Sequence, residues 1–278
     1  MPDIKKILFP VDFSESCYGA ARHVEAMAGR FEAEVMLLHA VGMGEHNLAE
    51  ELLPGRQARL NGFLAEDWKQ FATSRICIAG DAAHVIVDTA RSWRPDLVMI
   101  PTHGLGLFRR MLLGSVTAKV LHDLDCPVWT SVHSETTPVL EDIHCRKVLC
   151  AVDLGERSRS VLEWAKWIAG EYGAVLGIAH ATRELPPEYE GWKFSGDFSR
   201  AECENAMKGI EVLQLEAGTS AETLIRAGNS ARTIAAAVRE FSADILVIGR
   251  HDNSGLGGYL QHHAYAIARE SPCPVVSI

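Results

Sequence analysis

The sequence predicts an α/β protein made of two tandem, open, mainly parallel five-stranded sheets with helices on both faces. Three observations predict this fold. Short apolar runs alternate with longer amphipathic segments, the whole series occurs twice, and a chain of 278 residues is long enough for about two domains. Runs that are short and almost wholly apolar suit strands of a parallel sheet, because crossover helices cover both faces of such a sheet.

The repeat sets the domain organisation. Four segments of the first half recur in the same order in the second half, namely Lys5–Asp12 as Arg146–Asp153, the His-Ala pair 39–40 as 180–181, Pro95–His103 as Ala243–His251, and Cys126–Val132 as Cys273–Ile278. Because four matches in one order indicate a duplication, we expect one domain at residues 1–137 and a second at 143–278. The cluster of Ser, Thr, Pro and acidic residues near Ser134–Asp142 is typical of a linker.

The elements of the first half follow in chain order. The runs expected to form strands are ILFPV, EVMLLHA, RICIA, LVMIP and VWTSV. The segments between them are long enough for crossover helices, and we expect helices at Asp81–Ser92, whose apolar residues fall on one face, and at Val116–His122. In open sheets of this kind ligands bind beyond the carboxyl ends of the strands, where the strand order reverses. Residues just after each strand are therefore the candidates for a site.

The composition narrows the classes of function. The chain carries 27 basic and 36 acidic residues, a net charge of −9, so general binding of DNA or RNA and a polybasic membrane anchor are not expected. The seven cysteines are odd in number and form no CxxC pair, which disfavours a disulfide framework and a zinc ribbon. The sequence shows no signal-peptide pattern and no apolar run of the ~20 residues that span a bilayer, so it predicts a cytoplasmic protein.

A phosphate-loop pattern follows the run LVMI. Gly104 lies ten positions before Gly114, and Ser115 follows at the expected start of a helix. Glycines let the backbone approach a ligand closely, and a helix N-terminus offers free N–H groups and the positive end of a dipole to an anion. The Ser115 hydroxyl can cap this helix or donate to a phosphate oxygen. The spacing by itself leaves open an ordinary turn in which Ser115 is the N-cap.

Four features together give the whole chain a resemblance to a tandem member of the universal stress protein family. They are the opening ILFPVDFSES, the strand end LLHAV, the block THGLGLFRRMLLGSV and the terminal strands that begin with CPV. The resemblance implies an adenine-nucleotide α-hydrolase-like, Rossmann-like fold, dimerisation and a role in stress physiology. Family members that bind ATP carry the motif G-x2-G-x9-G-[S/T]. This chain matches it at Gly104, Gly114 and Ser115 but has Pro101 at the first position.

The resemblance also implies which residues of the first domain bind the nucleotide. Asp12 would meet the adenosine moiety, the backbone of Ala40 would face adenine, and residues around the motif would surround the phosphates. The implied set is Pro10, Val11, Asp12, Ala40, Thr102, His103, Gly104, Gly114, Ser115 and Val116. Pro101 has no N–H, and the loss of one charge-assisted hydrogen bond of about 1.5–3 kcal/mol would weaken ATP binding roughly tenfold to a hundredfold.

The second half has lost the pattern. Gly249, Asp252, His262 and His263 stand at the motif positions, and the Asp252 carboxylate would repel a phosphate. We therefore expect no ATP binding in this half. His251, Asp252, His262 and His263 instead form a candidate set for a divalent metal, zinc above all, because imidazole and carboxylate are zinc ligands. The alternative is that these histidines simply face solvent.

Other reactive side chains near the strand ends have structural alternatives. His39 and His180 end strands, where a hydrogen-bonded core histidine is expected, whereas His84 and His103 are expected in loops beside the site. Cys17 stands at a helix start, where the helix dipole can lower a thiol pKa. A buried and inert cysteine is the alternative for Cys17.

The sequence thus predicts a cytoplasmic stress-response protein that binds an adenine nucleotide, ATP or its product, in the first domain as a regulatory or binding module, with no catalytic residue assigned. Two alternatives stay open. One is a slow ATPase that uses the same pocket. The other is a scaffold that binds no nucleotide, or a protein that binds a metal or another small ligand through the second domain. The apolar last strands CPVWTSV and CPVVSI would lie at sheet edges. By resemblance, the two halves pair through them as a pseudo-dimer, and two chains then form a homodimer.

Overall fold

A computed structural model describes most of the chain. The described residues are 3–42, 49–102, 114–132, 139–183, 195–250 and 258–278. They form two compact units, Met1–Ile143 and His144–Ile278, and each unit holds one copy of the repeat. The boundaries predicted at residues 137 and 143 fall beside this division, and the exact extent of the linker stays a prediction.

Unit 1 is an open parallel sheet with its helices in crossover connections. Its strands are β1 (Lys6–Pro10), β2 (Glu34–Val41), β3 (Thr73–Ala79), β4 (Leu97–Ile100) and β5 (Val128–Thr130). Its helices are α1 (Glu15–Phe31), α2 (Ala49–Gly62), α3 (Ala82–Trp93), α4 (Ser115–Asp123) and the short 3-10 turn η1 (Leu140–Asp142). The strand order within the unit is β3-β2-β1-β4-β5, and these neighbours pair in parallel. The order therefore reverses between β1 and β4.

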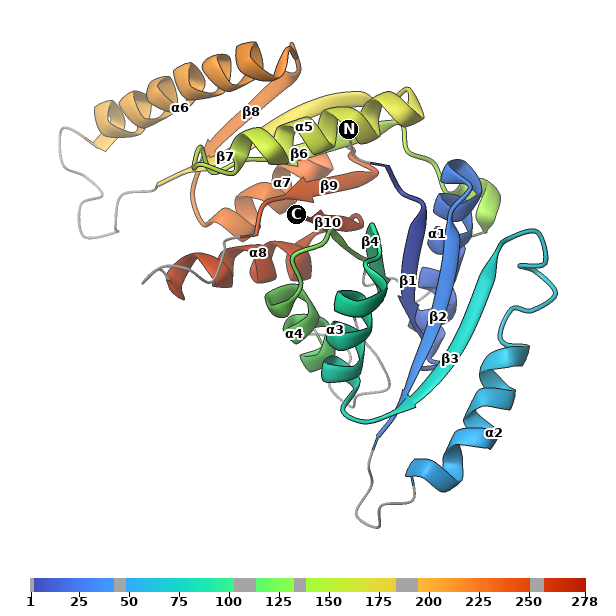
Figure 1. Ribbon diagram of the computed structural model, residues 1–278. Helices are drawn as coiled ribbons and strands as arrows, with labels where there is room; N and C mark the ends of the chain where they lie inside the picture. The colour runs from blue at the N-terminus through green and yellow to red at the C-terminus, as the bar shows by residue number, and fades with distance from the viewer. Residues whose placement is uncertain (1–2, 43–48, 103–113, 133–138, 184–194, 251–257) are drawn as a thin grey trace. The chain divides into compact units, whose positions relative to one another are not determined.

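The helices of unit 1 cover both faces of its sheet. Side chains of α3 and α4 pack with those of β1, β2 and β4 in one buried cluster that includes Val98 and Val120. Figure 1 shows α3 and α4 together on one side of these strands and α2 on the other. Phe9 of β1 contacts Trp68, which follows α2, with ring centroids 6.2 Å apart. The sheet is thus buried between two helical layers, as the apolar runs predict.

The start of α3 shows how local sequence sets the elements. The Asp81 side chain accepts the backbone N–H of His84 and caps the helix, which then runs one residue further than predicted, to Trp93. In β3, however, Ile76 and Ile78 are 38% and 37% exposed, so the expectation that this run is buried on both faces is wrong. The reason is topological, because β3 is the last strand in the order of its unit and an edge strand packs on fewer neighbours.

Unit 2 repeats the same architecture. Its strands are β6 (Lys147–Ala151), β7 (Val175–Thr182), β8 (Glu222–Ala227), β9 (Ile245–Ile248) and β10 (Val275–Ser277), in the order β10-β9-β6-β7-β8, all parallel. Its helices are α5 (Ser158–Tyr172), α6 (Ser195–Ala217), α7 (Ser230–Phe241) and α8 (Gly258–Glu270). In Figure 1, α5 and α6 lie on one side of these strands and α7 and α8 on the other. The predicted α/β fold class, with mainly parallel strands and helices between them, is confirmed.

The duplication extends to side-chain contacts that hold the first strand of each unit. In unit 1, Asp96 Oδ2 accepts the backbone N–H groups of residues 5 and 6 at 2.9 and 2.8 Å. In unit 2, Asp244 Oδ2 accepts those of residues 146 and 147 at 2.7 and 2.9 Å. Hydrogen bonds to a charged acceptor are strong. In both units an aspartate directly before the fourth strand therefore holds the start of the first strand through two such bonds.

Candidate functional site

The reversal of strand order in unit 1 is marked by two hydrogen bonds that join the start of α4 to the end of β4. The backbone N–H of Gly114 donates to the carbonyl of Thr102 at 2.9 Å, and the hydroxyl of Thr117 donates to the carbonyl of Pro101 at 3.0 Å. The chain therefore leaves the sheet and returns to it at one point, with α4 starting directly beside the end of β4. His103 and Gly104, two of the predicted site residues, lie between these ends and outside the described residues.

The first turn of α4 carries three of the predicted residues. Gly114 occupies the N-cap position, with φ −56° and ψ 142°, and among the described residues no side chain makes a capping hydrogen bond to this helix. Ser115 is the first helical residue and is exposed, so the reading of Ser115 as an N-cap is wrong. Val116 follows it and is half-buried. Since Gly114 has no side chain, it supplies no capping oxygen to the first N–H groups of α4.

Asp12 follows β1 and is held by the turn that starts α1. Its Oδ1 accepts the backbone N–H of Ser14 at 2.9 Å and the Ser14 hydroxyl at 2.6 Å. Phe13, between them, has a left-handed backbone with φ 62°, which is uncommon for a side chain of this size. The carboxylate orientation is therefore fixed by the fold. Asp12 itself is half-buried at the carboxyl edge of the sheet.

The same local geometry occurs after the first strand of unit 2. Asp153 Oδ1 accepts the backbone N–H of Gly155 at 2.8 Å and the hydroxyl of Ser158 at 3.0 Å, and Leu154 has φ 61°. A pair of aspartates in one conformation, one in each unit, shows that this turn belongs to the repeat.

The end of β2 is joined to the end of β1 through His39. Its Nδ1–H donates to the carbonyl of Val11 at 2.6 Å, because a carbonyl can only accept. Burial lowers the pKa of His39, and the positive charges of Arg56 and Arg59 on α2 lower it further. His180 makes the same bond to Val152 at 2.7 Å, so both strand-end histidines are structural, as expected. Ala40, the residue predicted to face adenine, follows His39 in β2. Pro10 ends β1 and pairs with Leu38, and Val11 directly follows the strand.

An aromatic cluster borders this edge on the α2 side. The ring of Phe13 lies 4.7 Å from the His39 ring and 5.8 Å from the Phe63 ring, and the Arg59 guanidinium lies over it at 4.1 Å. These tilted and edge-on ring contacts, together with the cation over the Phe13 ring, hold the side chain of the left-handed residue that follows Asp12.

Cys17 is not a reactive thiol. It is fully buried, and burial together with the nearby Asp12 carboxylate raises the pKa of its thiol to about 12. The possibility of a lowered thiol pKa is therefore wrong, and the inert alternative holds. The reason is that the loss of hydration outweighs the field of the helix start.

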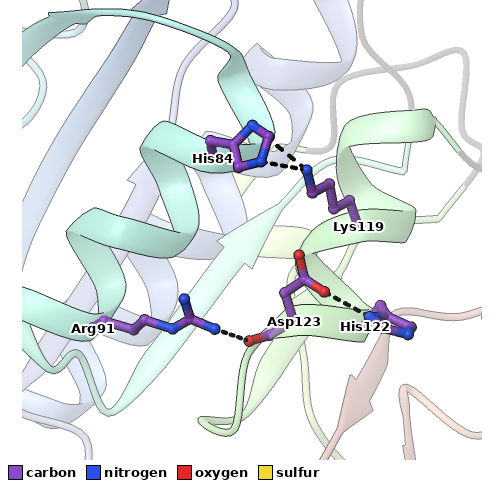
Figure 2. A network of polar contacts seen from close by, with 5 residues as sticks. All are labelled: His84, Arg91, Lys119, His122 and Asp123. Carbon is purple, nitrogen blue, oxygen red and sulfur yellow. Dashed lines mark hydrogen bonds and ion pairs between the residues drawn. The ribbon is translucent and has the colours of Figure 1, made fainter. Parts of the chain in front are cut away.

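A polar chain links α3 to α4 next to this edge (Figure 2). His84 Nδ1 lies 2.9 Å from Asp81 Oδ1, and its Nε2 lies 2.8 Å from the Nζ of Lys119. The pKa of Asp81 lies below its usual range, chiefly because its carboxylate accepts the backbone N–H of His84, with smaller effects from the His84 ring and Lys119. His84 belongs to the first turn of α3, so its assignment to a loop is wrong. Sequence reasoning missed Lys119, although its spacing of four from Ser115 on one helix could have indicated it.

The predicted residues of the second half receive less support. His251 and Asp252 lie outside the described residues, as do the side chains of His262 and His263, whose backbone belongs to α8. Among the residues whose placement is described, no group of three or more His, Cys, Asp or Glu side chains could hold a metal ion. The zinc hypothesis therefore gains no support from the structure.

The residue at the first motif position differs between the units in a way that the packing explains. A Cβ built on Gly249 would lie 3.1 Å from Cγ2 of Val161 on α5, tighter than an ordinary contact. Unit 1 has Pro101 at this position and Ala20 at the position of Val161, a smaller side chain on α1. Unit 2 thus combines the small Gly249 with the larger Val161, whereas unit 1 combines the larger Pro101 with the small Ala20. The smaller alanine leaves room for the proline ring.

The described helices include none that combines the length and apolar character needed to cross a bilayer. Two comparisons of fold extend over nearly the whole chain. A universal stress protein from Archaeoglobus fulgidus matches 98% of this chain and 97% of its own, with a TM-score of 0.73 at 21% identity. A putative universal stress protein from Pseudomonas aeruginosa matches 99% of this chain and 93% of its own, with a TM-score of 0.70 at 19% identity. At these identities the comparisons show the shared fold.

Comparison of sequences gives the family. A universal stress protein from Methanocaldococcus jannaschii is 32% identical over 136 residues, which are 45% of this chain and 79% of that protein. The sequence model of the universal stress protein family matches residues 3–131 and, a second time, residues 144–278. Both halves of the repeat are thus matched separately. The chain belongs to the universal stress protein family and is a tandem member of it.

Proposed function

We propose that unit 1 binds an adenine nucleotide, ATP or its product, and acts as a binding or regulatory module in a cytoplasmic stress response. One observation carries the proposal. The N-terminus of α4, with Gly114 as its N-cap and no capping side chain, is tied to the end of β4 where the strand order reverses. Open parallel sheets bind ligands at this point, and a helix N-terminus favours an anionic group such as phosphate.

The charges at the edge support a nucleotide with its phosphates at α4. The first N–H groups of α4 and the exposed Ser115 hydroxyl are donors, which suits phosphate oxygens. The Asp12 carboxylate, an acceptor, follows β1 and suits sugar hydroxyls. Its Oδ1 is engaged by Ser14, so Oδ2 is the oxygen assigned to the ligand. Thr102 is 2% exposed and its backbone closes the loop, so its role is to shape the site.

Unit 2 is the internal counterpart that does not bind ATP under this proposal. It keeps the Asp153 turn and the His180 bond. It has Asp252 and His262 where the motif has glycines. The negative charge of the Asp252 carboxylate, at a position where a phosphate would lie, opposes the binding of an anion. The proposed stoichiometry is therefore one nucleotide per chain.

Calorimetric titration of the full chain with ATP, ADP and AMP tests this function. We expect one site per chain, and mass spectrometry of ligands released from the purified protein should show an adenine nucleotide. Two equal sites would contradict the asymmetry, and the absence of binding by all three nucleotides would contradict the function. Phosphate release measured in the same samples separates a binding module, for which no turnover is expected, from a slow ATPase.

We also propose that the two halves pair through β5 and β10 as a pseudo-dimer and that two chains then form a homodimer. Each of these strands ends the order within its own unit, and each is apolar apart from one hydroxyl residue. A terminal strand has backbone donors and acceptors on its outer side that favour pairing with another strand. Residues 1–143 and 144–278, produced separately and mixed, should elute together in gel filtration. Two soluble halves that stay apart would contradict the pairing.

A further inference from the structure

The polar chain of Asp81, His84 and Lys119 has one consistent arrangement of protons. A lysine ammonium only donates, so Nε2 of His84 must accept from Lys119 Nζ at 2.8 Å. Nδ1–H of the same ring then donates to the Asp81 carboxylate at 2.9 Å. His84 thus bridges Asp81 and Lys119 and sets where the Lys119 ammonium lies. Figure 2 shows the Lys119 side chain extended from α4 toward His84 on α3.

Lys119 shares a helical face with the proposed phosphate donors. It lies four residues after Ser115, which places both on one side of α4 about 6 Å apart along the axis. Side chains on a helix lean toward its N-terminus, so the lysine stem is directed to the end at which Gly114 meets Thr102. The ammonium has three N–H donors and His84 occupies one of them. Among the described residues only His84 bonds this ammonium, so the other N–H groups can donate to oxygens of a second partner.

The polar contacts among Asp81, His84 and Lys119 contribute little to the stability of the fold. The side chains of His84 and Asp81 are 68% and 63% exposed, and polar pairs at such exposure stabilise a protein only slightly. The two helices are already joined by the buried cluster that contains Val120. At their other ends, Arg91 of α3 donates to the carbonyl of Asp123 at 3.4 Å, as Figure 2 shows. A structural role alone therefore does not account for a cation fixed at the open end of the helix pair.

Unit 2 provides a comparison inside the same chain. Asn229 replaces Asp81 and still caps its helix, its side chain accepting the backbone N–H of Arg232, which stands in place of His84. The hydrogen bonds at the ends of α4 and α8 match Leu124–Val120 with Ser271–Ile267, so the position of Lys119 is taken by Ala266. Alanine cannot donate a hydrogen bond. The cap is thus kept in both units, whereas the lysine on the fourth helix is replaced by Ala266 in unit 2, which instead carries Arg232 at the position of His84.

We propose that Lys119 contacts the distal phosphates of the nucleotide bound in unit 1, and that His84 and Asp81 are positioning residues for its ammonium. The proposal rests on the proposed function of unit 1. It assigns a selectivity as well as a contact, because a cation one turn beyond Ser115 meets the second and third phosphates rather than the first. Each added phosphate then increases the affinity, so ATP should bind most tightly, ADP less tightly and AMP least tightly. Lys119 lies outside the glycine motif, so the motif by itself does not predict this order.

Calorimetric titration of the full chain with ATP and AMP tests the proposal. Lys119→Met keeps the length of the stem and removes the charge, and we expect ATP binding to weaken about tenfold while AMP binding changes less than twofold. Lys119→Arg should recover part of the ATP affinity. Lys69→Met, an exposed lysine of the same unit that pairs with Glu66, is the matched control and should leave both affinities unchanged.

The positioning role has its own readout. His84→Gln keeps an acceptor for Lys119 and should retain most of the ATP preference over AMP, whereas His84→Leu should lose it. If Lys119→Met binds ATP and AMP with the same affinities as the wild type, this inference is overturned, whereas the proposed function still holds. Equal weakening of both nucleotides would also overturn it, since that is the signature of a disturbed helix. A wild-type protein that binds no nucleotide would overturn both.

Discussion

The N–H of Gly114 donates a 2.9 Å hydrogen bond to the carbonyl of Thr102, so two residues twelve positions apart meet at the end of β4. This bond joins the start of α4 to the end of β4, at the edge of the sheet where the strand order reverses. Four predictions follow from this arrangement and from the buried groups around it.

Replacement of Gly114 by valine should abolish nucleotide binding, with a loss of more than about a hundredfold in ATP affinity. A branched side chain at the N-cap would fill the space through which an anion approaches the first N–H groups of α4. The cost to folding should be only about 1 kcal/mol, because the backbone there is not left-handed. Titration and thermal unfolding measure the two effects. Gly55→Val on α2, where an added Cβ meets nothing within 4 Å, is the control. Unchanged ATP affinity in Gly114→Val would place the ligand elsewhere.

Substitution of Pro101 by glycine or alanine should strengthen ATP binding by roughly tenfold, because both restore a backbone N–H at the first motif position. Pro101→Gly should also lower the free energy of unfolding by about 1 kcal/mol, through the greater freedom of the unfolded chain, and Pro101→Ala by less. Titration of both variants measures the change in ATP affinity, and urea unfolding measures the change in the free energy of unfolding. Pro95→Ala, at the other end of β4, should not change binding. If neither variant at residue 101 binds ATP more tightly, the missing N–H is not what limits affinity.

Thr117→Val should destabilise unit 1 by roughly 1–2 kcal/mol and weaken nucleotide binding. The Thr117 hydroxyl is buried and donates to the carbonyl of Pro101 at 3.0 Å, so valine would leave that carbonyl without this donor. Thr117→Ser keeps the hydroxyl and should retain more of the affinity than valine. Urea unfolding and titration of the pair provide the measurement. A valine variant with wild-type affinity would show that the bond does not hold α4 in place.

Unit 1 should lose stability as the pH falls below about 6.5, because of His23 on α1. Its ring lies 4.9 Å from the Trp129 ring of β5, and burial lowers its pKa from 6.5 to about 4. The folded protein therefore favours the neutral His23 ring. As the pH falls, the ring takes up a proton in the unfolded chain at a higher pH than in the folded protein. The stability is fully present above pH 6.5 and is lost between 6.5 and about 4, by roughly 3 kcal/mol in all.

The His23 prediction is measured in two ways. Urea unfolding of the wild type and of His23→Phe at pH 7 and pH 4.5 should show a smaller loss in the variant. The ring signal that disappears in the NMR spectrum of His23→Phe should titrate near pH 4 in the wild type. A signal that titrates near pH 6.5 would show that the ring is hydrated, and the stability argument would then fail.

Most of the fold was predictable because its signals are local and occur twice. The apolar runs gave the strands of both units, and Asp81 before an amphipathic run correctly indicated the start of α3. Ser115 shows where local reasoning fails. A serine before a helix is usually its N-cap, yet here Gly114 takes that position because its bond to Thr102 fixes where the helix begins. Exposure of Ile76 and Ile78 was missed for a similar reason, since strand order is not a local property.

The sequence by itself determined the duplication, the α/β class, the family and the aspartates that end the first strand of each unit, because each of these is written in short segments or in their order along the chain. Only the tertiary structure decided which groups meet across elements. It placed Lys119 at 2.8 Å from His84, 35 residues away, and it buried Cys17 so that its thiol pKa rises. Distances and burial of this kind depend on how helices pack on a sheet, and the residues that pack together are far apart in sequence.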